Sequence, residues 1–544
     1  MEYDQVIVGG GISGLYTCYK LNDHRNTALF ESTYRLGGRL QTDRYQSFIM
    51  DYGPTRFQIR NDDNLVKLLK ELHIPFVETE KYKSIHVKPY LSQLTYNEKI
   101  VYQDAEQKGE SPVFSLIEFA LKEILGNQWD FETNHIFNET RTLNMTYLKC
   151  CATYREKPLW TYGTWDLLCV VLSPEALTYI KANSSFYHMI EYNLNAQTHI
   201  CYLLDILAAR GESKLYTIEN GMGVLTTRLE TEVAQHTKIY TGHTLVSIGN
   251  SCLGKKLKLT FICDNGNKVI VITSRLFLCM HQAGIDKILG LPTTIKNFVN
   301  CVQPIRLFKL FAIIEDPPSK GDDTNMEFIN NAYIPCREIH YRYNPKNNLG
   351  ELLLYGDFPS INYWRYYSVN QKNQIVPENN QNTELKKQIN SVLRRIFPEN
   401  ENINIIHYGI RDWSLPPFHS GVHFWKPDVN PFIICKYLRY FMMGEAKVSI
   451  CGEAFNFRQG YVESALESVE EALACDKNPW LNRTTPFPLL HTHVNGINSM
   501  NYNNMSNTNN TNNTNNTNNT NNTNNTNNTN NNVCLWCFRP HKTT

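Results

Sequence analysis

The sequence predicts an α/β protein whose first unit is a Rossmann-like nucleotide-binding fold. An apolar run at residues 6–8 leads into a glycine-rich loop at 9–14, and an amphipathic stretch from 12 to 21 follows. A second short strand is predicted at 27–30 and ends at the acidic residue Glu31. This order of strand, glycine loop, helix, strand and acid is typical of a dinucleotide-binding βαβ unit, whereas the glycine pattern alone would be a weak signal.

The glycine loop has the features that pyrophosphate binding requires. Gly9 supplies the tight turn, Gly11 lets the backbone approach the phosphates, and Gly14 allows the helix to pack on the strand. Ile12 and Ser13 begin the helix, whose N-terminus offers unpaired N–H donors and a partial positive charge.

The acid at the end of the second strand completes the predicted nucleotide site. The Glu31 carboxylate can accept hydrogen bonds from both hydroxyls of an adenosine ribose, and Ser32 follows it directly. Together with the loop, these residues predict a bound dinucleotide.

Composition narrows the class of protein. The 544 residues are enough for about two or three domains, and a formal net charge of +1 favours neither nucleic acid nor an anionic membrane as partner. The 15 cysteines show no disulfide framework, and we find no signal peptide or membrane-spanning stretch. We therefore expect a cytoplasmic protein, with packaging in a virion as the alternative for a virally encoded chain.

The remaining chain predicts two interleaved domains and a tail. Residues 1–60, 215–290 and 441–478 are expected to form one discontinuous nucleotide-binding domain. Residues 61–214, mostly helical, and 291–440, mostly strands and polar loops, are expected to form an α+β substrate domain. Periodicity predicts helices at 64–72, 115–125, 174–180, 224–234 and 461–474, and strands at 238–248, 256–263, 269–273, 276–280, 304–314 and 351–355.

The tail, residues 479–544, has a different character. Residues 498–532 are almost entirely Asn and Thr, with nothing to bury, so we expect disorder. Cys534, Cys537 and His541 fall short of the four ligands that a zinc site needs, so we expect no metal. A peptide that docks elsewhere and a tail without function both stay open.

Three motifs resemble the flavin-containing amine oxidase superfamily, to which monoamine oxidases and L-amino acid oxidases belong. Residues 35–42 are similar to the glycine pair and arginine that close over the FAD phosphates. Residues 450–454 and 459–468 resemble the closing FAD motif of that superfamily. The resemblance covers most of residues 1–478 and implies a Rossmann-like FAD-binding domain with a glutathione-reductase-type sheet.

The resemblance also implies which further residues hold FAD. Arg39 would bring a permanent charge and a planar fork of donors to the phosphates, Glu453 would meet the ribityl region, and Leu245 would pack on the adenine. Val422 stands where monoamine oxidases carry a flavin-linking cysteine, which implies non-covalent FAD. The full additional set is Arg35, Gly38, Arg39, Gly53, Pro54, Leu245, Gly452, Glu453 and Val462.

Within the superfamily, motif details are most similar to L-amino acid oxidases and tryptophan monooxygenase. Residues 53–57 resemble a turn whose arginine clamps the α-carboxylate of the substrate, which would be Arg56 here. Bidentate guanidinium–carboxylate pairing would orient an amino acid toward the flavin. The alternative is that Arg56 pairs with FAD or with a structural acid.

Three further residues are catalytic candidates by resemblance. His423 and Tyr461 fall where the family has two aromatic rings facing the flavin, in a cage that disfavours an ammonium ion. His423 replaces the usual tyrosine, so a base and a packed side chain both stay open. Arg306 stands where a lysine usually holds a water at flavin N5, and Lys309 would take that place only with a shift of register.

These observations predict an FAD enzyme that oxidises the Cα–N bond of an amino acid or related amine by hydride transfer. With O2 as acceptor, the products would be H2O2, a keto acid and ammonia. A polyamine or monoamine oxidase, or a flavin desaturase, is the alternative on the same fold, and an FAD-stabilised binding protein without turnover is another. The expected partners are a small-molecule amine and O2, with no nucleic acid and no membrane, and the oligomeric state stays open.

Overall fold

The protein is described by a computed structural model. It describes residues 1–22, 25–59, 62–79, 83–85, 91–129, 136, 143–184, 192–208, 214–251, 254–317, 326–329, 336, 338–368, 383–398 and 403–477. The Asn/Thr tract and the Cys534 and Cys537 segment lie outside these residues.

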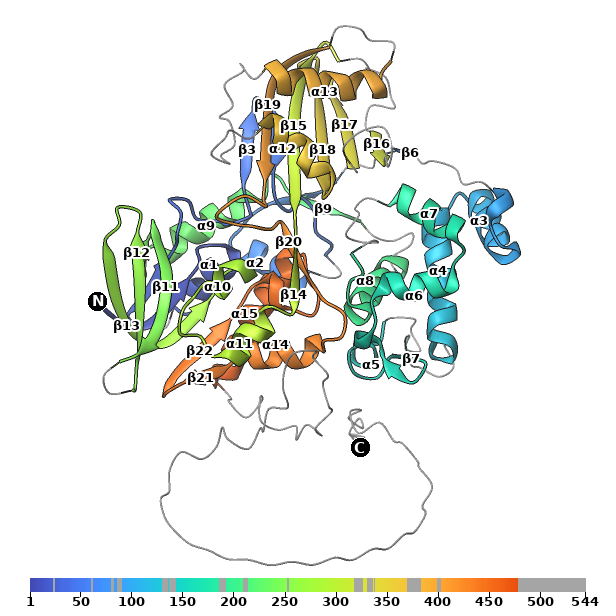
Figure 1. Ribbon diagram of the computed structural model, residues 1–544. Coiled ribbons are helices and arrows are strands. Elements are labelled where there is room, and N and C mark those ends of the chain that lie inside the picture. The colour runs from blue at the N-terminus through green and yellow to red at the C-terminus, as the bar shows by residue number, and fades with distance from the viewer. Residues whose placement is uncertain are drawn as a thin grey trace, which may run out of the picture.

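An eight-stranded mixed sheet lies in the lower left part of Figure 1. Its order is β10-β2-β1-β13-β12-β11, with β22 pairing the second half of β13 and β21 pairing β22. The strands are β1 (Glu2–Val8), β2 (Thr27–Phe30), β10 (Thr237–Tyr240), β11 (His243–Asn250), β12 (Leu257–Cys263), β13 (Lys268–Leu278), β21 (Phe441–Met443) and β22 (Ala446–Ile450). The strands β10, β2, β1, β13 and β22 pair in parallel, which explains the continuous apolar run at residues 6–8.

The strand β13 corrects the prediction of two separate strands at 269–273 and 276–280. Arg275 lies in its middle and is buried, with its Nε 2.9 Å from Asp476 Oδ2 and an Nη2 donation to Ser449 Oγ at 2.7 Å. Because this charge is paired, the strand continues through Arg275. Its first half pairs with β12 and its second half with β22.

Helices cover one face of the large sheet. These are α1 (Ile12–Lys20), α2 (Asp63–Glu71), α9 (Gly223–Val233) and α15 (Val462–Lys477), each within two or three residues of a predicted helix. Leu15, Leu69, Leu229 and Val469 share one apolar cluster with Ile7 of β1.

The opposite face of the sheet carries a second core. Val6 and Val8 point to this side, since successive strand residues alternate, and Phe30 stacks on Phe261 at 4.3 Å. The helices α10 (Gln282–Asp286), α11 (Thr293–Val299) and α14 (Pro431–Arg439) pack into the same cluster. Residues beyond 290 thus pack with the first sheet, and the domain boundaries stay a prediction.

A second sheet of six strands stands at the top of Figure 1. Its order is β19-β15-β18-β17-β16-β6, and the helices α12 (Ser360–Ser368) and α13 (Thr383–Ile396) pack against it through Trp364 and Leu393. The strands are β6 (Lys83–Ile85), β15 (Leu307–Glu315), β16 (Met326–Ile329), β17 (Glu338–Asn344), β18 (Leu349–Asp357) and β19 (Asn404–Asp412).

A helical region lies at the right of Figure 1. It contains α3 (Tyr96–Lys108), α4 (Pro112–Leu125), α5 (Met145–Cys150), α6 (Thr164–Val171), α7 (Pro174–Asn183) and α8 (Ala196–Ala208). The predicted helices at 115–125 and 174–180 are confirmed as α4 and α7, and both begin at a proline, which is favoured in the first turn.

Short strand pairs connect these regions and correct one expectation. The strand β9 (Tyr216–Ile218) pairs with β5 (Phe76–Glu78). The strand predicted at 304–314 is two strands, β14 (Val302–Ile305) and β15, separated at Arg306. The remaining pairs are β14 with β20 (Val422–Trp425), β3 (Thr42–Tyr45) with β4 (Phe48–Asp51), and β7 (Thr153–Tyr154) with β8 (Lys157–Pro158).

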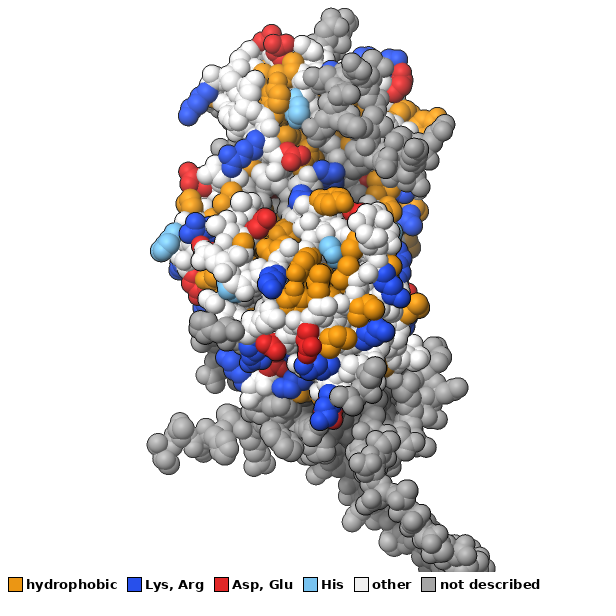
Figure 2. Space-filling view, turned by 90° about the vertical axis from the view of Figure 1, so that its left-hand side faces the viewer, with side chains coloured by type: hydrophobic (Ala, Val, Ile, Leu, Met, Phe, Trp, Pro, Cys, Tyr) orange, Lys and Arg blue, Asp and Glu red, His pale blue; other side chains and the backbone are white. Residues whose placement is uncertain are grey.

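The surface in Figure 2, the left-hand side of Figure 1, mixes lysine, arginine, aspartate and glutamate side chains around an apolar centre. Charges of both signs are interspersed there, in agreement with the small net charge. Within the described part of the chain, every helix is too short or too polar to cross a membrane.

The packing of α1 on β1 leads to a testable prediction. A Cβ added at Gly14 would lie 1.9 Å from Gly9 O and 3.4 Å from Ile7 Cγ2, so the substitution Gly14→Ala must displace the helix. We expect a loss of about 1–3 kcal/mol in the free energy of unfolding, measured by urea denaturation. The loss is expected because the added Cβ would meet backbone atoms, which cannot move aside as the end of a flexible side chain can.

The matched control is Gly249→Ala in β11, where an added Cβ meets nothing within 4 Å. Its effect should stay within about 0.5 kcal/mol. Equal effects of the two substitutions would contradict the close approach of helix and strand.

Candidate functional site

One cavity of about 1160 Å³ opens at the carboxyl ends of the parallel strands. Gly9, Glu31, Cys279 and Gly452 line it, and each follows within two residues of the end of β1, β2, β13 or β22. Ligands of open α/β sheets bind at this edge. The volume exceeds the roughly 300–1,000 Å³ of a pocket for one drug-sized ligand, so it can hold a dinucleotide with a small substrate.

Three glycines leave the backbone open to this cavity. A Cβ at Gly11 would meet only Gly38 Cα, at 3.8 Å, and one at Gly452 would meet nothing nearer than Met280 O, at 3.8 Å. Gly38 has φ 58°, a left-handed conformation in which side chains are rare. A side chain at Gly11 or Gly452 would extend into this open space, and one at Gly38 would press on Gly11 Cα at 3.1 Å, so glycine at these positions leaves room for a dinucleotide.

The first turn of α1 points its donors into the same space. Gly11 is the N-cap residue and has no side chain to satisfy the N–H groups that follow it. Ile12 and Ser13 both line the cavity. Unsatisfied N–H groups and the helix dipole make this end of α1 suited to an anion.

The Glu31 carboxylate is held at the mouth of the cavity by local hydrogen bonds. Gly10 N donates to Oε2 at 2.7 Å, while Thr33 N and Ser32 Oγ donate to Oε1 at 2.8 and 3.2 Å. The carboxylate is therefore fixed in position, and both Glu31 and Ser32 line the cavity.

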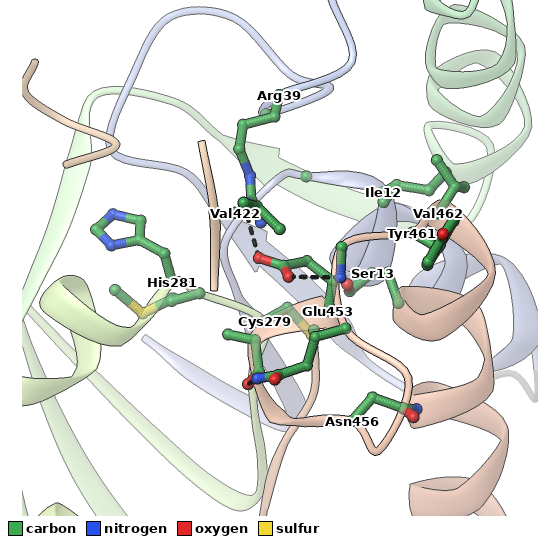
Figure 3. Close-up of a pocket in the computed structure, with 18 of the residues that line it drawn as sticks. Ile12, Ser13, Arg39, Cys279, His281, Val422, Glu453, Asn456, Tyr461 and Val462 are labelled. Atoms are coloured by element: carbon green, nitrogen blue, oxygen red, sulfur yellow. Dashed lines mark hydrogen bonds and ion pairs between the residues drawn. The ribbon is translucent and has the colours of Figure 1, made fainter. Parts of the chain in front are cut away.

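A buried charge cluster lies at the centre of the site (Figure 3). Arg39 Nη1 is 2.7 Å from Glu453 Oε1, and His423 Nδ1 is 2.8 Å from the same oxygen. Gly460 N donates to Glu453 Oε2 at 3.2 Å. Burial alone would raise the pKa of Glu453, but the charges and hydrogen bonds of Arg39 and His423 outweigh it and hold the pKa at about 2.

Most residues predicted to bind the cofactor line the cavity. The lining includes Gly9, Gly11, Ile12, Ser13, Glu31, Ser32, Gly38, Arg39, Gly53, Pro54, Leu245, Gly452, Glu453 and Val462, and also the catalytic candidate Tyr461. Gly14 and Arg35 are not in contact with it. Gly14 packs on Gly9, and Arg35 donates from Nη1 to Leu36 O and from Nη2 to Gly38 O, so it braces the second glycine turn.

His423 does not reach the cavity wall, because strand residues alternate sides. On β20, Val422 and Phe424 line the cavity, while His423 is fully buried on the other side between Glu453 and Ser420. The side chain that faces the cavity beside Val422 is therefore Phe424, in place of the predicted histidine.

Arg306 lies outside the cavity as well. Its exposed side chain sits at the break between β14 and β15, whereas Leu307 lines the cavity and packs against Gly421. This position outside the cavity does not support the predicted role of Arg306 at the reacting centre.

Two other cations lie behind the cavity wall. Lys309 is buried, donates to Asp51 O at 3.0 Å and Gly53 O at 2.6 Å, and sits 4.8 Å from the ring centroid of Tyr355, which lines the cavity. Burial lowers the pKa of Lys309 to about 8, although Asp51 and Glu338 oppose the shift. Arg56 is close enough to influence the pKa of both Lys309 and Tyr355, but it does not itself line the cavity.

The structure adds wall residues that sequence motifs did not indicate. Tyr202 from α8 faces Tyr461 with ring centroids 6.3 Å apart, and burial raises the pKa of both phenols. His281 also lines the cavity, where burial lowers its pKa to about 3, so it is neutral at physiological pH. The period-two pattern of β20 could have indicated Phe424, but no local signal marks Tyr202.

Comparison with known proteins places the fold. Residues 7–72 match the family of NAD(P)-binding Rossmann-like domains. An uncharacterized protein of Acanthamoeba polyphaga mimivirus is 21% identical over 502 residues, which are 87% of this chain and 93% of that protein. A triple mutant of putrescine oxidase, made to redesign cofactor binding, superimposes with a TM-score of 0.59 at 14% identity, over 88% of this chain and 99% of its own. Cyclohexylamine oxidase from Brevibacterium oxydans has a TM-score of 0.59 at 16% identity, over 88% and 99%.

Residues 7–72 thus match a Rossmann-like domain of the NAD(P)-binding type, and the cavity opens at the ends of its strands. More particularly, the fold is similar over most of the chain to that of putrescine oxidase and of cyclohexylamine oxidase, in agreement with the fold that the motifs implied.

The Glu453 cluster predicts how stability depends on pH. The pKa of Glu453 is lowered from 4.5 to about 2, so its charge stabilises the folded chain above pH 4.5 and this contribution is lost as the pH falls toward 2. We expect Glu453→Gln to destabilise at neutral pH by at most about 3 kcal/mol, and the difference from wild type to shrink progressively in acid. Thermal unfolding across this pH range measures both.

The control is Glu123→Gln on the exposed side of α4. The unfolding temperature of this variant should equal that of the wild type at every pH. A Glu453→Gln curve that also runs parallel to wild type throughout would show that the carboxylate is not held charged.

Proposed function

We propose that this chain is an FAD-dependent oxidoreductase that oxidises the C–N bond of an amine. The observation that carries the proposal is the continuity of one cavity. It extends from Glu31 at the nucleotide loop, past the Arg39–Glu453 pair, to a chamber walled by Tyr202, Tyr461 and other aromatic side chains. The likeness in fold to putrescine oxidase and cyclohexylamine oxidase supports the same chemistry.

The residues at the strand ends would bind the cofactor without a covalent link. The glycine loop, the N–H groups of Ile12 and Ser13, and Arg39 would hold the pyrophosphate. Glu31 and Ser32 would take the adenosine ribose, and Leu245 would pack on the adenine. Gly38, Gly53, Pro54, Gly452, Glu453 and Val462 would flank the rest of the molecule, and Arg35 and Gly14 would position the two loops.

When bound, FAD supplies the acceptor for a hydride from the carbon next to the amine nitrogen. The chain supplies the surroundings that this step needs. Leu307, Tyr355 and Phe424 form an apolar wall beside Val422, and such a wall disfavours an ammonium ion relative to a neutral amine. Tyr202 from α8 and Tyr461 from the turn before α15 would confine the substrate, while buried His423 would hold Glu453 in place.

The acceptor that we propose for the reduced cofactor is O2, with H2O2 as product. Arg306 is not part of this proposal, because its side chain lies outside the cavity.

An amino acid is the finer proposal for the substrate. Burial and the carboxylates of Glu338 and Asp357 raise the pKa of the wall residue Tyr355, and Arg56 opposes them, so a substrate carboxylate would find the guanidinium among acidic neighbours. His340 and, to a smaller extent, Arg56 hold the pKa of Glu338 low against the effect of burial. The carboxylate of a substrate would compete with Glu338, and an amine without a carboxylate would need no such exchange.

The first test concerns the cofactor. We expect the purified protein to be yellow, and acid or heat to release free FAD, since Val422 offers no thiol for a link. Anaerobic addition of a mixture of amines and amino acids should bleach the flavin absorbance. Flavin that stays with the denatured polypeptide would contradict non-covalent binding, and a bound flavin that no amine bleaches would favour a binding protein without turnover.

The second test concerns Arg56. If its guanidinium orients a carboxylate, Arg56→Ala should leave the flavin spectrum unchanged and lower kcat/KM for amino acids by a factor that corresponds to about 2–5 kcal/mol. Arg56→Lys should restore little, because lysine lacks the planar fork. Steady-state kinetics on an amino acid and on the matching decarboxylated amine measure the effect.

The control variant is Arg228→Ala on the exposed side of α9, which should leave both substrates unaffected. Equal losses on the two substrates in Arg56→Ala would identify a structural arginine and favour an amine without a carboxylate.

A further inference from the structure

One buried lysine holds a turn that forms part of the cavity wall. Residues 51–54, named here the wall turn, begin at the last residue of β4, and three of them line the cavity. Lys309 Nζ donates to Asp51 O at 3.0 Å and to Gly53 O at 2.6 Å. A single ammonium group thus bridges two carbonyls of the wall turn from behind the wall.

A second side chain takes the carbonyl between these two. Trp413 Nε1 donates to Tyr52 O at 2.7 Å. Lys309 lies on β15, and Trp413 directly follows β19, the strand that pairs with β15. Trp413 N also donates to Leu307 O at 3.0 Å, so the tryptophan continues that pairing. Three consecutive carbonyls of the wall turn are therefore fixed to two neighbouring strands of the second sheet.

The burial of Lys309 indicates that its donors matter. The residue is 2% exposed, and taking an ammonium group out of water is costly unless hydrogen bonds and opposite charges compensate for it. An apolar side chain of similar length would fill the same space without that cost, so packing alone does not call for a lysine. An apolar side chain could not donate to Asp51 O and Gly53 O, and both buried carbonyls would lose this partner.

The wall turn is in direct contact with the loop that carries Arg39. A Cβ added at Gly53 would lie 1.9 Å from Arg39 O, so the two backbones touch. Tyr52 N donates to Gln41 O at 3.0 Å beside this contact. The Arg39 side chain in turn pairs with Glu453 (Figure 3). A displacement of the wall turn would therefore move the backbone from which Arg39 reaches its partner.

We propose that Lys309 is a positioning residue, which holds the wall turn and, through it, the backbone of Arg39. Lys309 acts through the turn and not on a ligand, since its two donors set where Gly53 and Pro54 lie in the cavity wall. The second sheet thereby fixes the geometry at the strand ends of the first sheet, although the two sheets have separate hydrophobic cores. The proposal rests on the proposed function only for what occupies the cavity.

The test compares Lys309→Met with the wild-type full-length chain by hydrogen exchange and mass spectrometry. Methionine keeps most of the length of the side chain and removes both donors. We expect the backbone amides of residues 39–42 and 51–57 to exchange about tenfold faster in this variant, because two hydrogen bonds that keep this region closed are lost. Residues 5–8 in β1, which are held by the ladders of the large sheet, should exchange at the wild-type rate.

Trp413→Phe is the second variant, because it keeps an aromatic ring and removes the donor to Tyr52 O. It should accelerate exchange in the same two segments, and it decides the question if Lys309→Met fails to fold. The matched control is Trp425→Phe, which removes a buried Nε1 donor to Asn456 O at 2.8 Å. This control should leave exchange at residues 39–42 and 51–57 unchanged.

Two results of the exchange experiment would overturn the proposal. One is wild-type exchange at residues 39–42 in a folded Lys309→Met chain. The other is equal acceleration at residues 5–8, which would identify a lysine that supports the whole fold.

The visible circular dichroism of bound flavin is a second measurement on the same variant. It should change in Lys309→Met if the Arg39 loop moves, and an unchanged flavin signal would overturn the link between Lys309 and Arg39. Hydrogen exchange requires neither flavin nor turnover. A wild-type chain that shows the expected exchange pattern but binds no flavin would therefore count against the proposed function alone.

Discussion

The buried carboxylate of Glu453 is the charge on which the geometry of the cavity depends. Its partners come from segments far apart in the sequence, Arg39 from the loop after β2, His423 from β20 and Gly460 from the turn before α15. Removing a carboxylate from water costs several kcal/mol unless such partners are in place. The ion pair therefore requires all three segments to be in position together, and this requirement fixes the distance between the nucleotide loop and the wall of the chamber.

The same constraint explains why the cavity can be large and still well defined. Its floor consists of the ends of parallel strands, which the ladders of the eight-stranded sheet hold in register. Its walls come from elements with separate hydrophobic cores, with Tyr202 on α8 in the helical region and Tyr355 on β18 in the second sheet. Because each core is packed independently, the walls stay in position without filling the space between them.

The sequence predicts which residues gather at the strand ends of the cavity better than which residues form the walls of the chamber, for physical reasons. The glycine loop, Glu31 and α1 follow from short-range spacing, and α4 and α15 follow from helical periodicity. The unbroken β13 could not be predicted, because Arg275 in its middle is paired by Asp476 and Ser449. Both partners lie far along the chain. The placement of His423 and Arg306 failed for a related reason, since the side of the sheet that a residue faces depends on where β20 and β14 pair.

The charges behind the wall bear on the choice of substrate. Lys309, with a pKa of about 8, is mostly protonated at neutral pH, and its donors are taken by two backbone carbonyls. Arg56 adds a second positive charge near Tyr355, while Glu338 and Asp357 add negative charges beside the same phenol and Asp51 adds one beside Lys309. The charges behind this wall are therefore of both signs, and they neither simply repel an ammonium group nor simply attract a carboxylate. A substrate that brought either charge to this wall would have to replace one of these existing partners, whereas a neutral amine would not, because an unpaired charge that leaves water is costly.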